Sequence, residues 1–440
     1  MTIAAESRAY RKIINSWAMY DWANSAFATT IMAAMFPPFY RSLAVNAGLG
    51  EADATAAWAY TTSLSLLFVA LLAPVLGAIS DHTGGKKKFI AFFAVLGVIG
   101  TGLFAFLGDT SYLWASVLFM IGDVGFAGAN IFYESLLPHI AQKGDIDQVS
   151  TRGYAMGYLG GGILLIVNVL WYMNPDLFFM PSTGFALRAA FFSVAVWWAV
   201  FSIPLFRNVP EPPVVRIERE EVNFVRAGFS RLGHTFGQLR RYKQLLIFLI
   251  AFWIYNDGIG TIIKMATAYG DEIGIGLTDM TLALIITQFV GIPFSFGFGW
   301  LARRLGTKRS ILLGLGVYVL ISIAGYFMQT AIHFYILAFM VGTVQGGSQA
   351  LSRSLYGTMV PKSQSAEFFG FFSTSSKFAG IIGPLIFGVV SQITGASRLS
   401  ILSVIAFFII GGFLLIFVDE QEGRRVAVEE DIETGLMPAA

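Results

Sequence analysis

Apolar stretches long enough to cross a bilayer dominate this chain and leave little sequence for a soluble core. A spanning helix needs roughly 20 mostly apolar residues, and twelve such stretches follow one another. They cover residues 15–40, 54–80, 88–107, 111–136, 150–174, 184–206, 243–268, 279–301, 310–328, 333–357, 366–391 and 397–418. Only 13% of the residues are charged, whereas a soluble domain carries about 25%. The sequence therefore predicts an all-α membrane protein with twelve spans.

The longest polar stretch divides the predicted spans into two sets of six. We expect an N-terminal half at 1–206, a linker at 207–242, a C-terminal half at 243–418 and a disordered acidic tail at 419–440. Within the linker, Phe229, Leu232 and Phe236 fall near one face of a helix over 224–241, close to several arginines. This pattern predicts an interfacial helix on the inner leaflet, with a plain solvated helix as the alternative.

Basic residues predict the orientation of the chain. Of the 29 Lys and Arg, 23 fall on the side of the N-terminus, and three, Arg41, Arg188 and Arg398, fall on the other side. The remaining three lie inside the spans. Because cytoplasmic loops carry the excess of Lys and Arg, we expect both termini in the cytoplasm and the protein in the cell (inner) membrane.

The sequence lacks the motifs that indicate disulfides, metal sites or nucleotide binding. The chain has no Cys, its four His are scattered, and the loop "GGKKK" lacks the spacing of a phosphate-binding loop. The net charge of +2 gives no reason to expect a nucleic-acid partner. We therefore expect no cofactor, no metal and no enzymatic activity. We also expect a monomer in the lipid bilayer.

Two loops of the chain repeat one pattern. "GAISDHTGGKKK" at 77–88 and "GWLARRLGTKRS" at 299–310 match with an offset of 222 residues, which indicates two halves related by duplication. Gly77 lets a neighbouring helix approach, Gly84 permits a tight turn, and Asp81 can form and break a charge link. The alternative is a basic anchor with a turn. The candidate gate residues are Gly77, Asp81, Gly84, Lys86, Lys87, Gly299, Arg303 and Gly306.

The first loop resembles the signature of the major facilitator superfamily, G-x-x-x-D-x-x-G-x-K/R, in which two parallel six-helix halves are typical. His82 stands where that signature usually has Arg, and Arg303 stands where the second copy would have Asp. "YDWANSA" (20–26), "RGYAMGYLGGG" (152–162), "YNDG" (255–258), "QALSRS" (349–354), "AEFFGF" (366–371) and "KFAGIIGP" (377–384) are similar to the vacuole-effluxer-like family. The resemblance implies a bacterial transporter, with amino acids as a candidate cargo.

Polar residues inside the spans form stripes at helical spacing. An Asp at the centre of a spanning helix costs roughly 2.5–3.5 kcal/mol, so such residues face the bundle interior or a wet cavity. The candidate substrate and coupling residues are Asp21, Asn24, Asp123, Asn130, Glu134, Asn256, Asp257, Lys264, Gln345, Gln349, Arg353 and Lys377. The alternative is structural pairing, of Asp257 with Lys264 and of Glu134 with Arg353.

These features favour a secondary transporter of a small polar or zwitterionic solute, exported by alternating access, with proton coupling as one option. A flippase for lipids or other amphiphiles is the alternative within transport. A membrane receptor or enzyme is a weaker alternative, because no extra soluble domain and no clustered catalytic set are visible.

Overall fold

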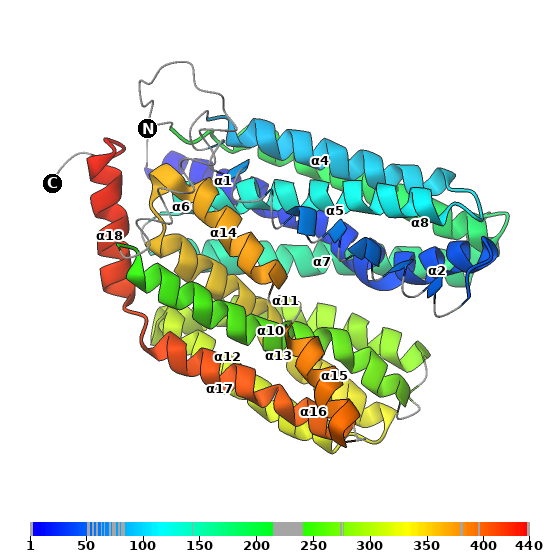
Figure 1. Ribbon diagram of the computed structural model, residues 1–440. Helices are drawn as coiled ribbons and strands as arrows, with labels where there is room; N and C mark the ends of the chain where they lie inside the picture. Colours follow the sequence, from blue (N-terminus) through cyan, green and yellow to red (C-terminus); the bar gives the residue numbers. More distant parts are fainter. Residues whose placement is uncertain are drawn as a thin grey trace. The chain divides into compact units, whose positions relative to one another are not determined.

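The computed structural model of this chain is helical throughout the part that it describes (Figure 1). That part covers residues 3–50, 53–54, 57–58, 60–62, 64–65, 67–69, 72, 76–77, 80, 84–142, 144–213, 241–272, 275, 277–378, 382–394 and 397–437. Asp81, His82 and the predicted interfacial helix at 224–241 lie outside these ranges. So do the side chains of Lys264 and Lys377.

Consecutive helices make up the described part of the chain. They are α1 (Ile3–Ala26), the π-helix η1 (Phe27–Met35), α2 (Phe36–Asn46), α4 (Lys86–Leu103), η2 (Phe104–Phe106), α5 (Tyr112–Ser135), α6 (Leu137–Ile140), α7 (Ile146–Met173), η3 (Pro175–Phe178), α8 (Thr183–Asn208), α10 (Lys243–Glu272), α11 (Leu277–Leu305), α12 (Thr307–Tyr326), α13 (Ala331–Met359), η4 (Lys362–Gln364), α14 (Ser365–Phe378), α15 (Ile382–Thr394), α16 (Ser397–Ser403), α17 (Ile405–Ile416) and α18 (Glu420–Glu433).

Nine helices within the described ranges are long and apolar enough to cross a membrane. The first predicted span, 15–40, corresponds to α1, η1 and α2, which continue one another and include a π-helical stretch. The second predicted span, 54–80, is described only in fragments, and the eleventh is represented by α14 and α15 on either side of residues 379–381. Twelve spans therefore stay a prediction, while the all-helical membrane fold is confirmed.

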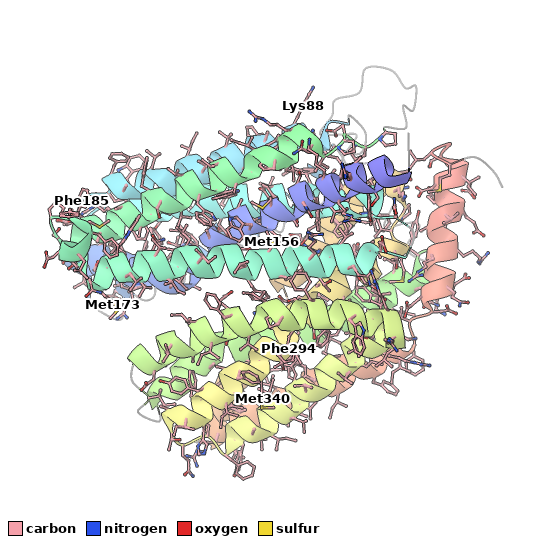
Figure 2. All side chains as sticks on the ribbon, turned by 180° about the vertical axis from the view of Figure 1, so that it is seen from behind. Lys88, Met156, Met173, Phe185, Phe294 and Met340 are labelled. Atoms are coloured by element: carbon pink, nitrogen blue, oxygen red, sulfur yellow. The ribbon has the colours of Figure 1, made fainter. Side chains whose placement is uncertain are left out.

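The chain forms two compact units, of which the first comprises 1–73, 85–133 and 156–212. Here α8 packs against both α1 and α4. Figure 2 shows Lys88 at one end of the α4–α8 pair and Phe185 at the other. Close approach depends on small residues, since a β-carbon at Gly97 would collide with Trp198, and one at Gly160 with the backbone of Trp22. Gly160 of α7 (Ile146–Met173) thus allows α7 to pack closely against α1.

The second unit comprises 74–84, 134–155 and 213–440. In it, α11 packs against α13, α10 against α17, and α12 against α13; Phe294 and Met340 mark α11 and α13 in Figure 2. This unit also contains the end of α5, α6 and the start of α7. Its limits thus differ from the six-helix halves expected at 1–206 and 243–418, because polar contacts described below hold 134–155 to α11, α12 and α13.

The acidic tail corrects a sequence-based expectation. We expected disorder at 419–440, but α18 packs against α10 and α13 and lies across their ends (Figure 1). Asp431 is 2% exposed and accepts hydrogen bonds of 2.9 Å from the backbone N–H groups of Lys362 and Ser363. Arg241 forms ion pairs with Glu430 and Glu433 at 3.1 and 2.8 Å. The contacts of these acidic residues hold the tail in place. Its shortage of large apolar residues therefore did not indicate disorder.

Candidate functional site

Polar residues of the first and fourth predicted spans meet in the first unit. The Asn24 amide donates a hydrogen bond of 2.6 Å to Oδ1 of Asn130, and the Tyr133 hydroxyl donates one of 2.7 Å to Asp21. Trp17 fixes this arrangement, because its indole N–H donates to the Tyr133 carbonyl at 3.1 Å and its ring stacks on that of Tyr133. The stripes predicted on α1 and α5 therefore face each other.

Asp123 on α5 has a different hydrogen-bond partner from the residues of that cluster. Its side chain is 2% exposed, and its Oδ2 accepts a hydrogen bond of 2.6 Å from the Ser65 hydroxyl. A buried carboxylate with a short polar contact agrees with an inward-facing position on α5. The structure assigns Asp123 a partner that the sequence stripe did not indicate.

Asp257 on α10 is 1% exposed and contacts α15. Its Oδ2 accepts a hydrogen bond of 3.0 Å from the backbone N–H of Gly383. Gly383 is required here, because a β-carbon would collide with Thr261 and approach Asp257. The predicted pairing of Asp257 with Lys264 stays a prediction.

The polar residues of α13 and a neighbour on α10 take different positions. Asn256, Gln345 and Gln349 are half-buried. Gln345 lines a cavity of about 130 Å³ among α10, α11, α12, α13, α15 and α16, whose walls are mostly apolar. The hydroxyls of Thr287 and Ser322 in this wall donate hydrogen bonds to backbone carbonyls. Their protons are therefore not available to a solute in the cavity.

Arg353 on α13 is a buried cation in the second unit, with 2% exposure. Its guanidinium lies 3.8 Å from the Glu134 carboxylate, donates to the Ser150 hydroxyl at 2.9 Å and to the Ser150 carbonyl at 2.8 Å, and stacks over the Tyr154 ring at 4.5 Å. The sequence proposed Glu134 and Arg353 as partners. The structure brings them together and adds α7 to the contact.

Both repeated loops pack tightly at their first glycine. A β-carbon at Gly77 would collide with the backbone carbonyl of Ala366, at the start of α14. One at Gly299 would lie 2.6 Å from Oγ1 of Thr151 in α7. The loop residues Gly84 and Gly306 have φ of +71° and +88°, a backbone conformation that favours glycine. Both loops therefore have the close approach and the tight turn that the sequence predicted.

The repeat is one residue out of the register that the sequence suggested. Helix α4 begins at Lys86 and α12 at Thr307, which are 221 residues apart rather than 222. The first loop thus carries one extra residue, and the left-handed Gly85 directly precedes α4 just as Gly306 precedes α12.

Two lysines make equivalent contacts in that corrected register. Lys87 donates to the carbonyls of Phe206 and Val209 at 2.8 and 2.7 Å, at the end of α8. Lys308 donates to the carbonyls of Ile416 and Val418 at 3.2 and 2.7 Å, at the end of α17. Each lysine satisfies carbonyls that a helix leaves without internal partners at its end. The pair is Lys87 and Lys308; the sequence had paired Lys308 with Lys86, which is buried.

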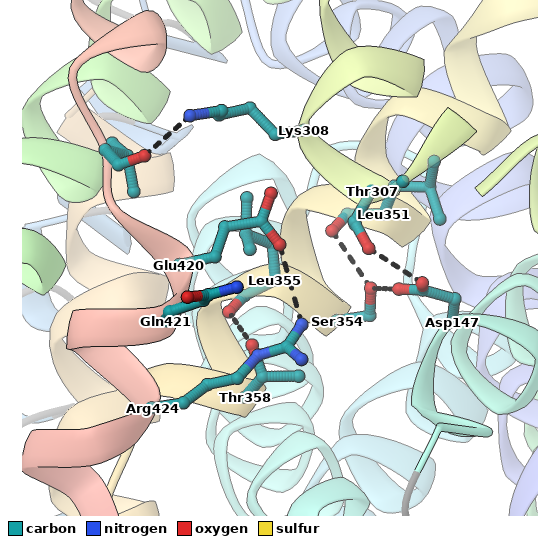
Figure 3. A network of polar contacts seen from close by, with 12 residues as sticks. Asp147, Thr307, Lys308, Leu351, Ser354, Leu355, Thr358, Glu420, Gln421 and Arg424 are labelled. Carbon is teal, nitrogen blue, oxygen red and sulfur yellow. Dashed lines mark hydrogen bonds and ion pairs between the residues drawn. The ribbon is translucent and has the colours of Figure 1, made fainter. Parts of the chain in front are cut away.

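The sequence reasoning missed the acidic start of α7. Asp147 accepts hydrogen bonds from the hydroxyls of Thr307, at 2.8 Å, and Ser354 (Figure 3). Asp145 lies 4.0 Å from Arg303. Two acidic residues just before a predicted span were a usable signal. The partners of Asp147 lie 160 and 207 residues away in the sequence, however, and no periodicity links them.

Comparisons with known proteins identify the family of this chain. The chain matches the vacuole effluxer Atg22-like family over residues 9–428. It is 39% identical over 423 residues to an uncharacterized MFS-type transporter, YxiO of Bacillus subtilis (strain 168), covering 96% of this chain and 98% of that one. It is 24% identical to autophagy-related protein 22 of Coccidioides immitis (strain RS), covering 94% and 80%.

Solved structures show the same fold at low sequence identity. The proton:xylose symporter XylE aligns with a TM-score of 0.74 at 14% identity, over 97% of this chain and 99% of that one. The fucose:proton symporter FucP aligns with a TM-score of 0.69 at 14% identity, over 93% and 98%. The chain therefore belongs to the vacuole effluxer Atg22-like family, and it is a multi-pass membrane transporter of the major facilitator type rather than an enzyme.

Proposed function

We propose that this transporter exports a small polar or zwitterionic solute, an amino acid or a related compound, by alternating access. It acts as a monomer in the cell inner membrane, with both termini in the cytoplasm. Polar pairs inside the apolar helices support a polar cargo, since Asn24 with Asn130 and Asp21 with Tyr133 place amide, carboxylate and hydroxyl groups together. The family resemblance supports amino acids as the class to test first.

Asp257 carries the proposal of coupling to a proton gradient. It is a carboxylate buried to 1% exposure that accepts a hydrogen bond from the Gly383 N–H of α15. Protonation would remove the charge of the acceptor and would weaken that hydrogen bond. The protonation state of Asp257 would then control how firmly α15 is held to α10, which is the link that coupling requires.

Flux in proteoliposomes tests this role. We expect Asp257→Asn to abolish solute accumulation driven by a pH gradient while exchange without a gradient continues, because an amide cannot cycle a proton. Asp21→Asn should slow both exchange and net flux, because its contact with Tyr133 joins α1 to α5. If Asp257→Asn accumulates solute at the wild-type rate, the coupling role is wrong and Asp257 only holds α15.

The cavity lined by Gln345 favours a second candidate, transport of an amphiphile. Its walls are mostly apolar and its volume is about 130 Å³, which suits part of an apolar chain better than a charged solute. Flux of a fluorescent lysolipid beside flux of amino acids in the same vesicles separates the two candidates. Lysolipid movement without amino-acid movement would favour the amphiphile.

A further inference from the structure

The two repeated loops differ in the charge at one equivalent position. The first loop carries Asp81 four residues after Gly77, whereas the second carries Arg303 four residues after Gly299. A latch built like the first would therefore lack its carboxylate in the second loop. Arg303 does lie 4.0 Å from Asp145, but the two side chains are 61% and 40% exposed, and such surface pairs contribute only about 0–1 kcal/mol.

A carboxylate reaches the second loop from another helix. Asp147 lies in the first turn of α7, and its Oδ2 accepts a hydrogen bond of 2.8 Å from Oγ1 of Thr307, the residue that begins α12. Its Oδ1 accepts a hydrogen bond from the hydroxyl of Ser354 on α13. Figure 3 shows Asp147 with both hydroxyls directed at it. Thr307 is 6% exposed and Ser354 is fully buried, so water competes weakly for these hydrogen bonds.

Neighbouring contacts hold the same two surfaces together. Gln148 donates to the carbonyl of Gly299 at 3.2 Å, and the Ser150 hydroxyl donates to the carbonyl of Ala350 at 2.7 Å. The first two turns of α7 therefore contact the end of α11, the start of α12 and the second half of α13. Hydrogen bonds to a charged acceptor are stronger than those between neutral groups, so Asp147 contributes most among these contacts.

We propose that Asp147 is the carboxylate of the second gate, supplied by α7 in place of the acid that the second loop lacks. In the closed arrangement the Asp147 carboxylate accepts hydrogen bonds from Thr307 and Ser354. When the gate opens, both hydrogen bonds break and water replaces the two hydroxyl donors. Arg303 and Asp145 add a weak outer contact. This inference rests on the proposed alternating access, but it concerns the gate and not the identity of the solute.

Distances between spin labels test the latch without any cargo. Because the chain has no Cys, labels can be introduced at Gln142 and Leu305, both exposed. The label distances report the populations of the open and closed arrangements. We expect Asp147→Ala to raise the ratio of the open to the closed population by about tenfold, which is the effect of losing hydrogen bonds to a charged group. The double variant Thr307→Val with Ser354→Ala removes only the donors and should give a similar shift.

Thr358→Val is the matched control, since this hydroxyl on α13 donates a hydrogen bond of 2.8 Å to the Leu355 carbonyl of its own helix. Its distances should equal those of the wild type. Unchanged distances in both latch variants, or an equal shift in Thr358→Val, would overturn the latch. If the latch variants shift as expected but wild-type vesicles move no polar solute, the proposed cargo is wrong and the latch stands.

Discussion

Replacing Arg353 should reveal how strongly the polar network holds the second unit together. The guanidinium is 2% exposed and 3.8 Å from Glu134, a separation at which two unit charges attract by about 4 kcal/mol at an effective dielectric constant near 20. Since Glu134 is 18% exposed, water weakens that attraction, and we take about 2 kcal/mol for the pair. Two hydrogen bonds to Ser150 add about 2 kcal/mol net.

We therefore expect Arg353→Met to lower the free energy of unfolding by about 4 kcal/mol, and Glu134→Gln to lower it by about 2 kcal/mol. The double variant should cost about 4 kcal/mol rather than 6, because the pair is lost only once. Reversible unfolding in mixed lipid–detergent micelles, followed by tryptophan fluorescence, measures these values. Arg304→Met is the control: Arg304 is exposed beside Trp300 and should cost less than about 1 kcal/mol. Additive single effects would refute the reasoning.

Three further predictions concern other parts of the chain. Gly77→Ala should destabilise the protein by about 1–3 kcal/mol, because its β-carbon meets the Ala366 backbone, while Gly316→Ala, with no atom within 4 Å, should be neutral or stabilising in the same unfolding assay. Burial, and to a lesser degree Glu430, raises the pKa of Tyr242 above its ordinary 10.0; wild-type stability should therefore fall as pH rises above 10.0, and Tyr242→Phe should show a shallower fall, whereas equal slopes would contradict this cause. Asp431→Asn should speed hydrogen exchange at the amides of 362–363, since an amide oxygen is a weaker acceptor than the carboxylate they now share; unchanged exchange would mean that other contacts hold α18.

Periodicity located the inward-facing polar residues but only part of their pairing. Spacing along α1 and α5 was enough to place Asp21, Asn24 and Asn130 on interior faces. The structure adds their partners, Asn130 for Asn24 and Tyr133 for Asp21, which the spacing did not indicate. Charge alone suggested the pair of Glu134 with Arg353. Hydrophobic patterning could not have found Asp147, because a residue at a helix start belongs to no stripe and its partners come from distant segments.

Two expectations were wrong for local reasons. The acidic composition of α18 predicted a disordered tail. Composition does not show that Asp431 accepts hydrogen bonds from two backbone amides, or that Arg241 forms an ion pair with Glu430. The register of the repeat was wrong by one residue because "GG" in the first loop offers two glycines for one turn, and only the backbone shows that Gly85 immediately precedes α4.

Counterflow in proteoliposomes tests the central claim most directly. Vesicles containing the purified protein are loaded with an unlabelled amino acid, diluted into a trace of the labelled compound, and followed for transient accumulation inside; empty vesicles serve as the control. Alternating access around a polar site predicts that label accumulates above the outside concentration for at least one small zwitterionic solute, and that Asp21→Asn reduces the rate. Absence of counterflow for all amino acids tested, in vesicles that do move lysolipid, would contradict the account.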